Sequence, residues 1–179
     1  ITRRRPVYAE TLVRPNVSRD AAFDKIAFRA SWSPDAQYLL LDGFGRGKHL
    51  HYDTNAIITY VDRNQRWLLD HDYLVRNSTE HAMASVIRNG RSDALVPSCA
   101  GLRAFGDGSR AAMTSTEVRD YLGLDWVRSL FWRKGRYFVV MDRFTARKAA
   151  SYDIDLTWKL ADEGTTGLVA PGVFLADRS

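Results

Sequence analysis

Apolar and polar side chains alternate along much of the chain with a period of two. Between positions 152 and 160 the apolar residues are Tyr152, Ile154, Leu156, Trp158 and Leu160, and polar residues stand between them. In an extended strand this alternation places all the apolar side chains on one face, whereas a helix would scatter them around its circumference. The pattern predicts a half-buried β-strand, and no long segment shows the apolar stripe of an amphipathic helix.

Turn sequences separate further segments that are rich in β-forming residues. The predicted strands are Lys25–Ala30, Tyr38–Asp42, Ala56–Val61, Arg66–Asp70, Met83–Arg88, Asp125–Arg133 and Arg136–Phe144. The turns predicted between or after them are Ser33-Pro34-Asp35, Asp62–Gln65, Asn89-Gly90 and Lys134-Gly135. Short strands at regular spacing are typical of antiparallel sheets, so we expect residues 1–179 to form a single all-β domain, an antiparallel β-sandwich. Its core should contain Trp126, Leu130, Tyr137, Val139, Ile154, Leu156 and Trp158.

Composition and charge narrow the choice of partners. The chain is 45% hydrophobic and 26% charged, and no apolar run could cross a membrane as a helix. A net charge of +5 favours anionic partners, but the only basic cluster, Arg3–Arg5, lacks a groove-reading motif, so nucleic acid is not indicated. The lone Cys99 excludes an intrachain disulfide framework. No signal peptide is visible.

The four histidines carry the clearest chemical signal, because His49, His51, His71 and His81 all lie between positions 49 and 81. Imidazole is the commonest transition-metal ligand and titrates near neutral pH. His49 and His51 are two residues apart, so in extended backbone both rings would project from one face. The metal or active-site segment is therefore expected at about residues 43–88.

Asp70 is the acidic residue best placed to join these histidines. It ends an apolar strand, where a buried carboxylate needs a partner, and with His51 and His81 it would make a three-ligand site of the catalytic zinc type. His71 follows Asp70 directly and should point to the opposite face, toward the surface. If Ile57 faces Asp70 across the hairpin, His51 would lie roughly 20 Å away along a straight strand. The segment 48–55 must therefore leave the ladder and fold back.

The glycines before the histidines do not form a phosphate-binding loop. The segment Gly43–Lys48 lacks the required spacing, and neither Ser or Thr nor a helix follows Lys48. We expect instead a loop in which glycines let the backbone approach the site closely.

Taken together, these segments resemble the heparinase II/III-like polysaccharide lyases. The resemblance extends from about Phe23 to Leu160 and is carried by the His-x-His, Asp and His series. The segments that carry it are Phe23–Arg29, Tyr38–Leu41, His49–Asn55, Trp67–Asp70, the His81 segment, Trp126–Arg128 and Tyr137–Asp142. Family members often have Asn after the third metal-binding His, whereas Ala82 follows here.

The resemblance implies a function and a missing part. The family joins an N-terminal helical toroid to a C-terminal sandwich, and this chain looks like the sandwich. By the same resemblance, His51, Asp70 and His81 would bind a structural zinc ion, and His49 would face the substrate cleft as the catalytic residue. The expected reaction is β-elimination on a uronate-containing acidic polysaccharide, in a periplasmic or secreted protein. The isolated chain is expected to be inactive without the toroid.

Two other functions fit parts of the sequence. A cupin-like metal enzyme would use Gly43, His49 and His51 as the start of a Gly-x5-His-x-His motif, but Asn55 and Ala56 stand where its Glu is expected. A non-catalytic carbohydrate-binding sandwich would use exposed Trp and Tyr side chains as sugar platforms.

Overall fold

The computed structural model describes residues 1–4, 17–45, 51–70, 77–92, 96–161, 165–171 and 173–177. Its elements in chain order are β1 (Thr2–Arg4), β2 (Lys25–Arg29), β3 (Tyr38–Asp42), β4 (Ile57–Asp62), β5 (Gln65–Leu69), the 3₁₀ helix η1 (Ser78–Glu80), β6 (Ala84–Arg88), β7 (Gly101–Asp107), β8 (Ala111–Tyr121), β9 (Leu124–Arg133), β10 (Tyr137–Ala146), β11 (Tyr152–Leu156), β12 (Thr165–Ala170) and β13 (Val173–Asp177). The described residues contain no α-helix, so the expected all-β class is confirmed. None of their helical segments is long and apolar enough to span a membrane.

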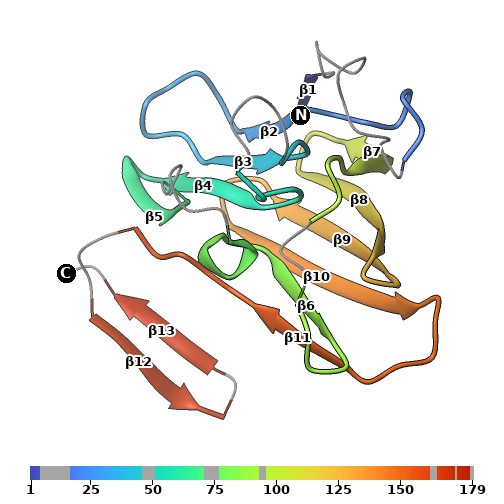
Figure 1. The fold of residues 1–179 in the computed structure, drawn as a ribbon. Helices are drawn as coiled ribbons and strands as arrows, with labels where there is room; N and C mark the ends of the chain where they lie inside the picture. Colours follow the sequence, from blue (N-terminus) through green and yellow to red (C-terminus); the bar gives the residue numbers. More distant parts are fainter. Residues whose placement is uncertain are drawn as a thin grey trace.

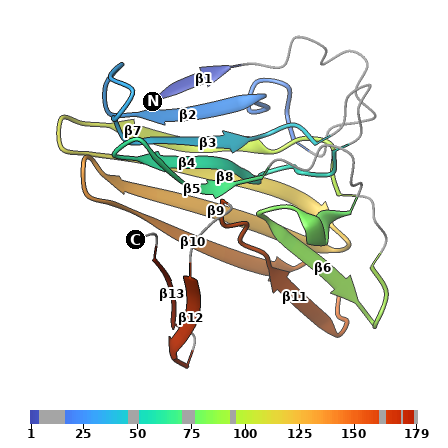
Figure 2. The same cartoon turned by 90° about the vertical axis from the view of Figure 1, so that its left-hand side faces the viewer.

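The strands form two larger and two smaller antiparallel sheets (Figure 1). The five-stranded sheet has the order β1-β2-β3-β4-β5, and the four-stranded sheet has the order β10-β9-β8-β7. Strands β11 and β6 form one two-stranded sheet, and β12 and β13 form the other. In the turned view of Figure 2 strands of the two larger sheets overlap, and Phe28 of one sheet contacts Trp132 of the other, as in the predicted sandwich.

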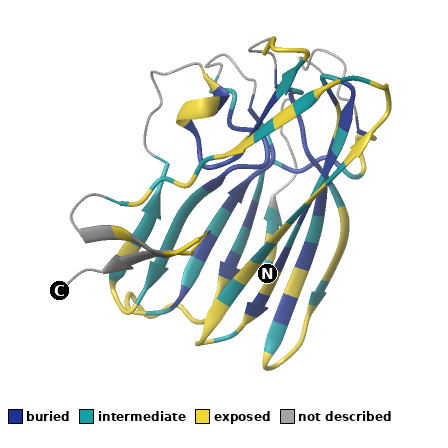
Figure 3. Ribbon diagram, turned by 90° about the horizontal axis from the view of Figure 1, so that it is seen from below, coloured by how far each residue is buried: buried dark blue, intermediate teal, exposed yellow. Residues whose placement is uncertain are grey.

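The core lies between the two larger sheets because each contributes one apolar face. On β9 the buried residues alternate strictly with less buried ones, as a strand with one face on a core requires (Figure 3). Phe28 of β2 meets Trp132 of β9 edge to face, with ring centroids 6.1 Å apart. Trp132 in turn stacks on Phe138 of β10 at 5.3 Å. Such aromatic pairs contribute roughly 0.5–1.5 kcal/mol beyond their burial.

The expected core was right in part. Trp126 and Leu130 are buried, and Ile154 packs partly buried against the same cluster. Four residues expected in the core are instead about half exposed: Tyr137, Val139, Leu156 and Trp158. Strand β10 carries apolar residues on both faces, so its composition did not reveal that Phe138, Val140 and Phe144 are the ones that pack inward. Leu156 ends β11, which pairs only with β6 and lies outside the two larger sheets, and Trp158 follows this strand.

Three of the predicted hairpins formed where predicted. Arg63 and Asn64 join β4 to β5 with φ of 52° and 59°, the left-handed values of a tight hairpin turn. Gly135, with φ of 69°, lies in the turn between β9 and β10. Strands β2 and β3 also pair across the predicted turn, with Arg29 opposite Tyr38.

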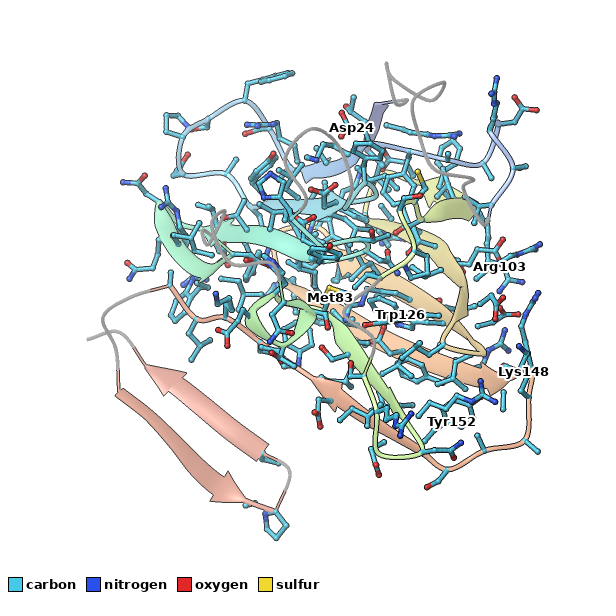
Figure 4. All side chains as sticks on the ribbon, viewed as in Figure 1. Asp24, Met83, Arg103, Trp126, Lys148 and Tyr152 are labelled. Atoms are coloured by element: carbon cyan, nitrogen blue, oxygen red, sulfur yellow. The ribbon has the colours of Figure 1, made fainter. Side chains whose placement is uncertain are left out.

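The Asn89-Gly90 turn formed without the hairpin that it usually signals. Both residues have positive φ, but beyond them the chain makes only an isolated bridge between Arg88 and Arg91. Strand β6 pairs instead with β11, which lies far along the chain. The Tyr152 hydroxyl at the start of β11 donates to the Lys148 carbonyl oxygen at 3.0 Å and so fixes the connection from β10 (Figure 4). Strands β7 and β8, which form one side of the four-stranded sheet, were not predicted from the sequence.

Candidate functional site

A buried carboxylate–imidazole pair forms the centre of the candidate site. The Asp70 Oδ1 atom lies 3.0 Å from His81 Nδ1, and both side chains are only 2% exposed. The other carboxylate oxygen, Oδ2, accepts a hydrogen bond from the Ala82 backbone N–H at 2.9 Å. The donor and acceptor roles in this contact follow the tautomer: when a neutral His81 donates from Nδ1 to the carboxylate, the lone pair of the ring lies on Nε2. This is the form in which an imidazole can bind a metal or accept a proton.

Two short backbone features position this pair. The Asp70 N–H donates to the Ile58 carbonyl at 2.8 Å, which extends the β4–β5 ladder to Asp70. On the other side, the Asn77 side chain accepts from Thr79 N and begins η1, and His81 ends it by donating from its backbone N–H to Ser78 O. A 3₁₀ turn is short and tight, so the chain reverses quickly and brings His81 back over Asp70.

The segment 51–56 leaves the ladder and folds back, as the spacing required. Tyr52 and Asn55 both have left-handed φ values, 61° and 69°, and Tyr52 N donates to Gly45 O at 2.9 Å. A Cβ atom on Gly45 would lie 2.3 Å from Thr54 Oγ1, so only glycine fits there. The expectation that glycines allow a close backbone approach is confirmed at this position.

Buried acidic groups surround His51 and His81. Asp42 is 4% exposed, and its Oδ2 atom lies 2.7 Å from Lys25 Nζ. Burial, together with the negative charge of Asp53, nevertheless raises the pKa of Asp42 to about 7. Burial also raises the pKa of Asp53, while positive charge on His81 and His51 opposes that rise. The Oδ1 atom of Asp53 is buried and has no hydrogen-bond partner in the described part of the chain.

Arg128 of β9 ties the two histidine segments to the four-stranded sheet. Its side chain is 1% exposed, and its Nε and Nη2 atoms donate to the two carboxylate oxygens of Asp142 at 2.9 and 3.0 Å. Its Nη1 atom donates to the carbonyl oxygens of Asn55 at 2.9 Å and Ala82 at 3.4 Å. One guanidinium therefore holds both the segment after His51 and the segment after His81.

Aromatic rings complete the surroundings of Arg128. The Trp126 ring lies 4.8 Å from its guanidinium carbon and the Trp158 ring 6.0 Å. Met83, which follows the His81 segment, and Trp126 both belong to the buried core, and their labels mark the middle of the molecule in Figure 4. The planar guanidinium is thus enclosed by rings and hydrogen-bond acceptors, which a lysine could not satisfy in the same way.

The structure brings some of the predicted site residues together. Asp70 and His81 are in direct contact, and His51 and His81 both act electrostatically on Asp53. Within the described ranges, however, no three His, Cys, Asp or Glu side chains are arranged to hold a metal ion. His49 and His71 lie outside the described residues.

Sequence reasoning missed Asp42, Asp53 and Arg128 as parts of the site. A signal for Arg128 existed, because it occupies the buried parity of β9 between Trp126 and Leu130. A charged residue on an otherwise apolar strand face needs a buried partner, and that partner is a candidate for a structural or functional role. The signal for Asp53 was weaker, since one acidic residue in a loop is usually solvated.

Known proteins resemble this chain in structure. No family model and no curated protein sequence matches it. Among solved structures, the heparan sulfate lyase HepC from Pedobacter heparinus matches with a TM-score of 0.66 and 16% identity, over 82% of this chain and 24% of that one. A heparinase III gene product matches with a TM-score of 0.65 and 17% identity, over 83% and 24%.

Another heparinase III matches with a TM-score of 0.65 and 13% identity, over 82% of this chain and 25% of that one. The chain therefore spans about a quarter of the length of these solved enzymes. At such low identity the likeness establishes the fold, and the residues of the site must carry any argument about chemistry. The chain has the antiparallel β-sandwich fold of one part of these heparinases.

Proposed function

We propose that this chain is the sandwich domain of a polysaccharide lyase that cleaves a uronate-containing acidic polysaccharide by β-elimination. The observation that carries the proposal is the buried Asp70–His81 pair within a sandwich that resembles part of solved heparan sulfate lyases. A carboxylate in contact with an imidazole is common at metal and proton-transfer sites. The net charge of +5 also suits an anionic polymer.

The proposal includes a structural zinc ion held by His51, Asp70 and His81. Their donor types suit zinc, and the 3.0 Å contact between Asp70 Oδ1 and His81 Nδ1 places two of the three proposed ligands side by side. Within the described residues no third such side chain joins this pair. When bound, zinc would tie the segments 51–56 and 77–82 together and contribute folding free energy.

The chemistry needs three functions at one sugar unit. The uronate carboxylate must be neutralised, a base must remove the proton at C5, and an acid must protonate the leaving glycosidic oxygen. We assign His49 to the cleft, either as the base or as a donor to the carboxylate. The remaining groups would come from an N-terminal helical toroid in the longer natural protein. We place that protein in the periplasm or outside the cell.

The isolated chain should be inactive or nearly so. Without an opposing domain it has no enclosed cleft to orient the polymer, and the loss of positioning alone can remove several kcal/mol of barrier lowering, about 7 or more in well-oriented systems. Product formation is measured by the far-ultraviolet absorbance of the unsaturated uronate, with glycosaminoglycan and alginate panels as substrates. Strong product formation by the isolated chain would show that it is a complete enzyme.

Variants separate the two histidines of the His-x-His pair. In the longer protein, His49→Ala should lower kcat and leave the zinc content unchanged, whereas Asp70→Ala should lower zinc content and melting temperature together. His71→Ala is the matched control and should change none of these. Loss of zinc in His49→Ala would show that the roles of His49 and His51 are reversed. Polymer binding with no product from the longer protein would favour the non-catalytic carbohydrate-binding alternative.

A further inference from the structure

Trp32 is the most unusual side chain on the surface of the described residues. It lies in the turn between β2 and β3 and is 88% exposed, the largest exposed fraction among the large apolar side chains described. Tryptophan is usually well buried, because its ring contributes a large apolar area. A ring exposed to this extent is available to contact a ligand.

The exposed ring belongs to a stack of three side chains. The Arg29 guanidinium carbon lies 4.8 Å from the centroid of the Trp32 ring and 4.4 Å from that of Tyr38. Arg29 and Tyr38 are direct partners in the β2–β3 register, so both lie on one face of the sheet. In the described part of the chain no carboxylate pairs with Arg29. Its N–H donors are therefore held in place by two rings and not by an acidic partner.

Hydrogen bonds order the loop that carries Trp32. Ala30 N donates to Gln37 O at 2.9 Å and Ala36 N donates to Ser33 O at 3.0 Å, which closes the loop at its base and at its tip. Arg63 N, in the neighbouring β4–β5 turn, donates to Asp35 O at 3.1 Å. The stack is thus preorganised, and binding to it would cost little ordering entropy.

We propose that Trp32, Arg29 and Tyr38 form a binding site for one acidic sugar unit of a polysaccharide. The apolar face of a pyranose ring would pack on the Trp32 ring, and the guanidinium of Arg29 would donate paired hydrogen bonds to a carboxylate or sulfate. Arg63 and Arg136 are exposed in the adjacent β4–β5 and β9–β10 turns and add positive charge at the same end of the molecule. A neutral sugar would not use these cations, so we commit to an anionic ligand.

The site is separate from the Asp70–His81 pair. Arg29 and Tyr38 form one end of the β2–β3 ladder, and Lys25 and Asp42, beside the buried acidic groups, form the other. Four residues of extended strand correspond to roughly 13 Å. A polymer bound at Trp32 would therefore be held at a sugar unit other than the one whose bond is cleaved. The identity of the polymer rests on the proposed function, whereas the site itself rests on the stack and its unpaired cation.

The test uses the isolated chain and a defined heparin hexasaccharide, with a neutral cello-oligosaccharide of the same length as the comparison ligand. Binding is measured by calorimetry, and the Trp32 indole N–H is followed by NMR. Trp32→Ala and Arg29→Gln should each weaken heparin binding by about tenfold. Arg29→Lys keeps the charge but loses the planar guanidinium, so its heparin affinity should lie between that of these variants and that of the wild type. Melting temperatures should stay unchanged, because the ring is exposed.

Arg143→Gln is the matched control, since it removes the same charge from an exposed position on β10 in the other large sheet. It should weaken binding by no more than about twofold. Equal losses in Arg143→Gln and Arg29→Gln would show diffuse charge attraction and overturn the site. Absence of heparin binding, or equal binding of the neutral sugar, would also overturn it. If the longer protein makes no product while the Trp32 variants still lose binding, the proposed lyase activity fails and this inference stands.

Discussion

The two large sheets differ in strand length, and the candidate site follows the difference. Strands β7 to β10 are 7 to 11 residues long, whereas β1 to β5 are 3 to 6 residues long. Short strands reverse the chain often, so the five-stranded sheet presents many loop ends: Asp42 ends β3, Asp70 directly follows β5, and Asp53 lies in the loop between β3 and β4. The long sheet supplies one apolar face of the core. The candidate site is therefore gathered at loops of the short sheet, and the long sheet contacts these loops through Arg128.

Arg128 is a charged residue of the long sheet that contacts the loops of the short one. It is a charged residue on the buried face of the long sheet, and its Nη1 atom reaches carbonyl oxygens in the loops of the site. If the long sheet positions the site through this side chain, changes at Arg128 should lower stability strongly.

The largest effect is expected from Arg128→Met. It leaves the Asp142 carboxylate buried without its charged partner and removes the donor to Asn55 O and Ala82 O, so the free energy of unfolding should fall by about 3–5 kcal/mol. The double variant Arg128→Met, Asp142→Leu removes both charges and should recover much of the loss. Urea denaturation measures both. A single-variant loss below about 1 kcal/mol would contradict the role of Arg128 as the connection between the sheets.

Opposite faces of the long sheet should respond very differently to the loss of an apolar side chain. Leu130 is 1% exposed on the inner face, so Leu130→Ala should lower the free energy of unfolding by about 2–5 kcal/mol. Val139 is 48% exposed on the outer face, and Val139→Ala should change it by less than about 0.5 kcal/mol. Thermal and urea unfolding of the two variants provide the measurement. Comparable losses would mean that another surface buries Val139 in solution.

The buried acidic group of the short sheet should give stability a distinct pH dependence. The pKa of Asp42 is raised to about 7 in the folded protein, so between its ordinary value near 4 and pH 7 the folded state binds more protons than the unfolded state. The stabilisation is therefore complete below about pH 4 and is lost as the pH rises toward 7, with a slope of up to about 1.4 kcal/mol per pH unit. Asp42→Asn stays neutral and should reduce this slope, and Asp53, whose pKa burial also raises, accounts for what remains.

Asp107 on the long sheet provides the control for that measurement. Hydrogen bonds from Lys134 and the N-terminal amine lower its pKa, so its contribution is lost only as the pH falls below its ordinary value. In Asp107→Asn the free energy of unfolding should therefore change with pH between 4 and 7 as it does in the wild type. If Asp42→Asn keeps the wild-type slope in urea titrations across this range, Asp42 is not the group responsible.

The sequence predicted the fold better than it predicted the site, for physical reasons. A period of two along β9 reports directly which residues face a core, and short turn sequences such as Asp62–Gln65 report hairpins locally. The contacts of the site are not local, because Arg128 reaches Asn55 and Ala82 from distant positions in the chain. The Asp70–His81 pair was found only because its residue types and order were distinctive. Asp42 and Asp53 belong to no periodic pattern of apolar and polar residues that would have indicated their burial.

The same limit explains the errors in the expected core. Strand β10 has apolar residues on both parities, so only its register with β9 decides that Val139 lies opposite the exposed Phe131 and that Val140 lies opposite the buried Leu130. Register depends on the partner strand and cannot be read from one strand whose two faces look alike. β8 was missed because its alternation uses small and hydroxyl residues, Ala112, Thr114 and Thr116, in place of large apolar ones.

The smallest expected effect separates two turns that look alike in sequence. Gly135 joins two long strands of the four-stranded sheet, whereas Gly90 follows β6 and leads only to an isolated bridge. Both have left-handed φ, 69° and 71°, and a Cβ atom would meet nothing within 4 Å at either position. The cost of alanine at each is therefore backbone strain alone, about 1 kcal/mol.

Gly135→Ala should lower the free energy of global unfolding by that amount, since the β9–β10 hairpin is part of the core. Gly90→Ala should instead raise amide hydrogen exchange in β6 and β11 and change the global value less, because these two strands pair with neither of the larger sheets. Equal effects of the two variants on global unfolding would mean that β6 and β11 unfold together with the sandwich.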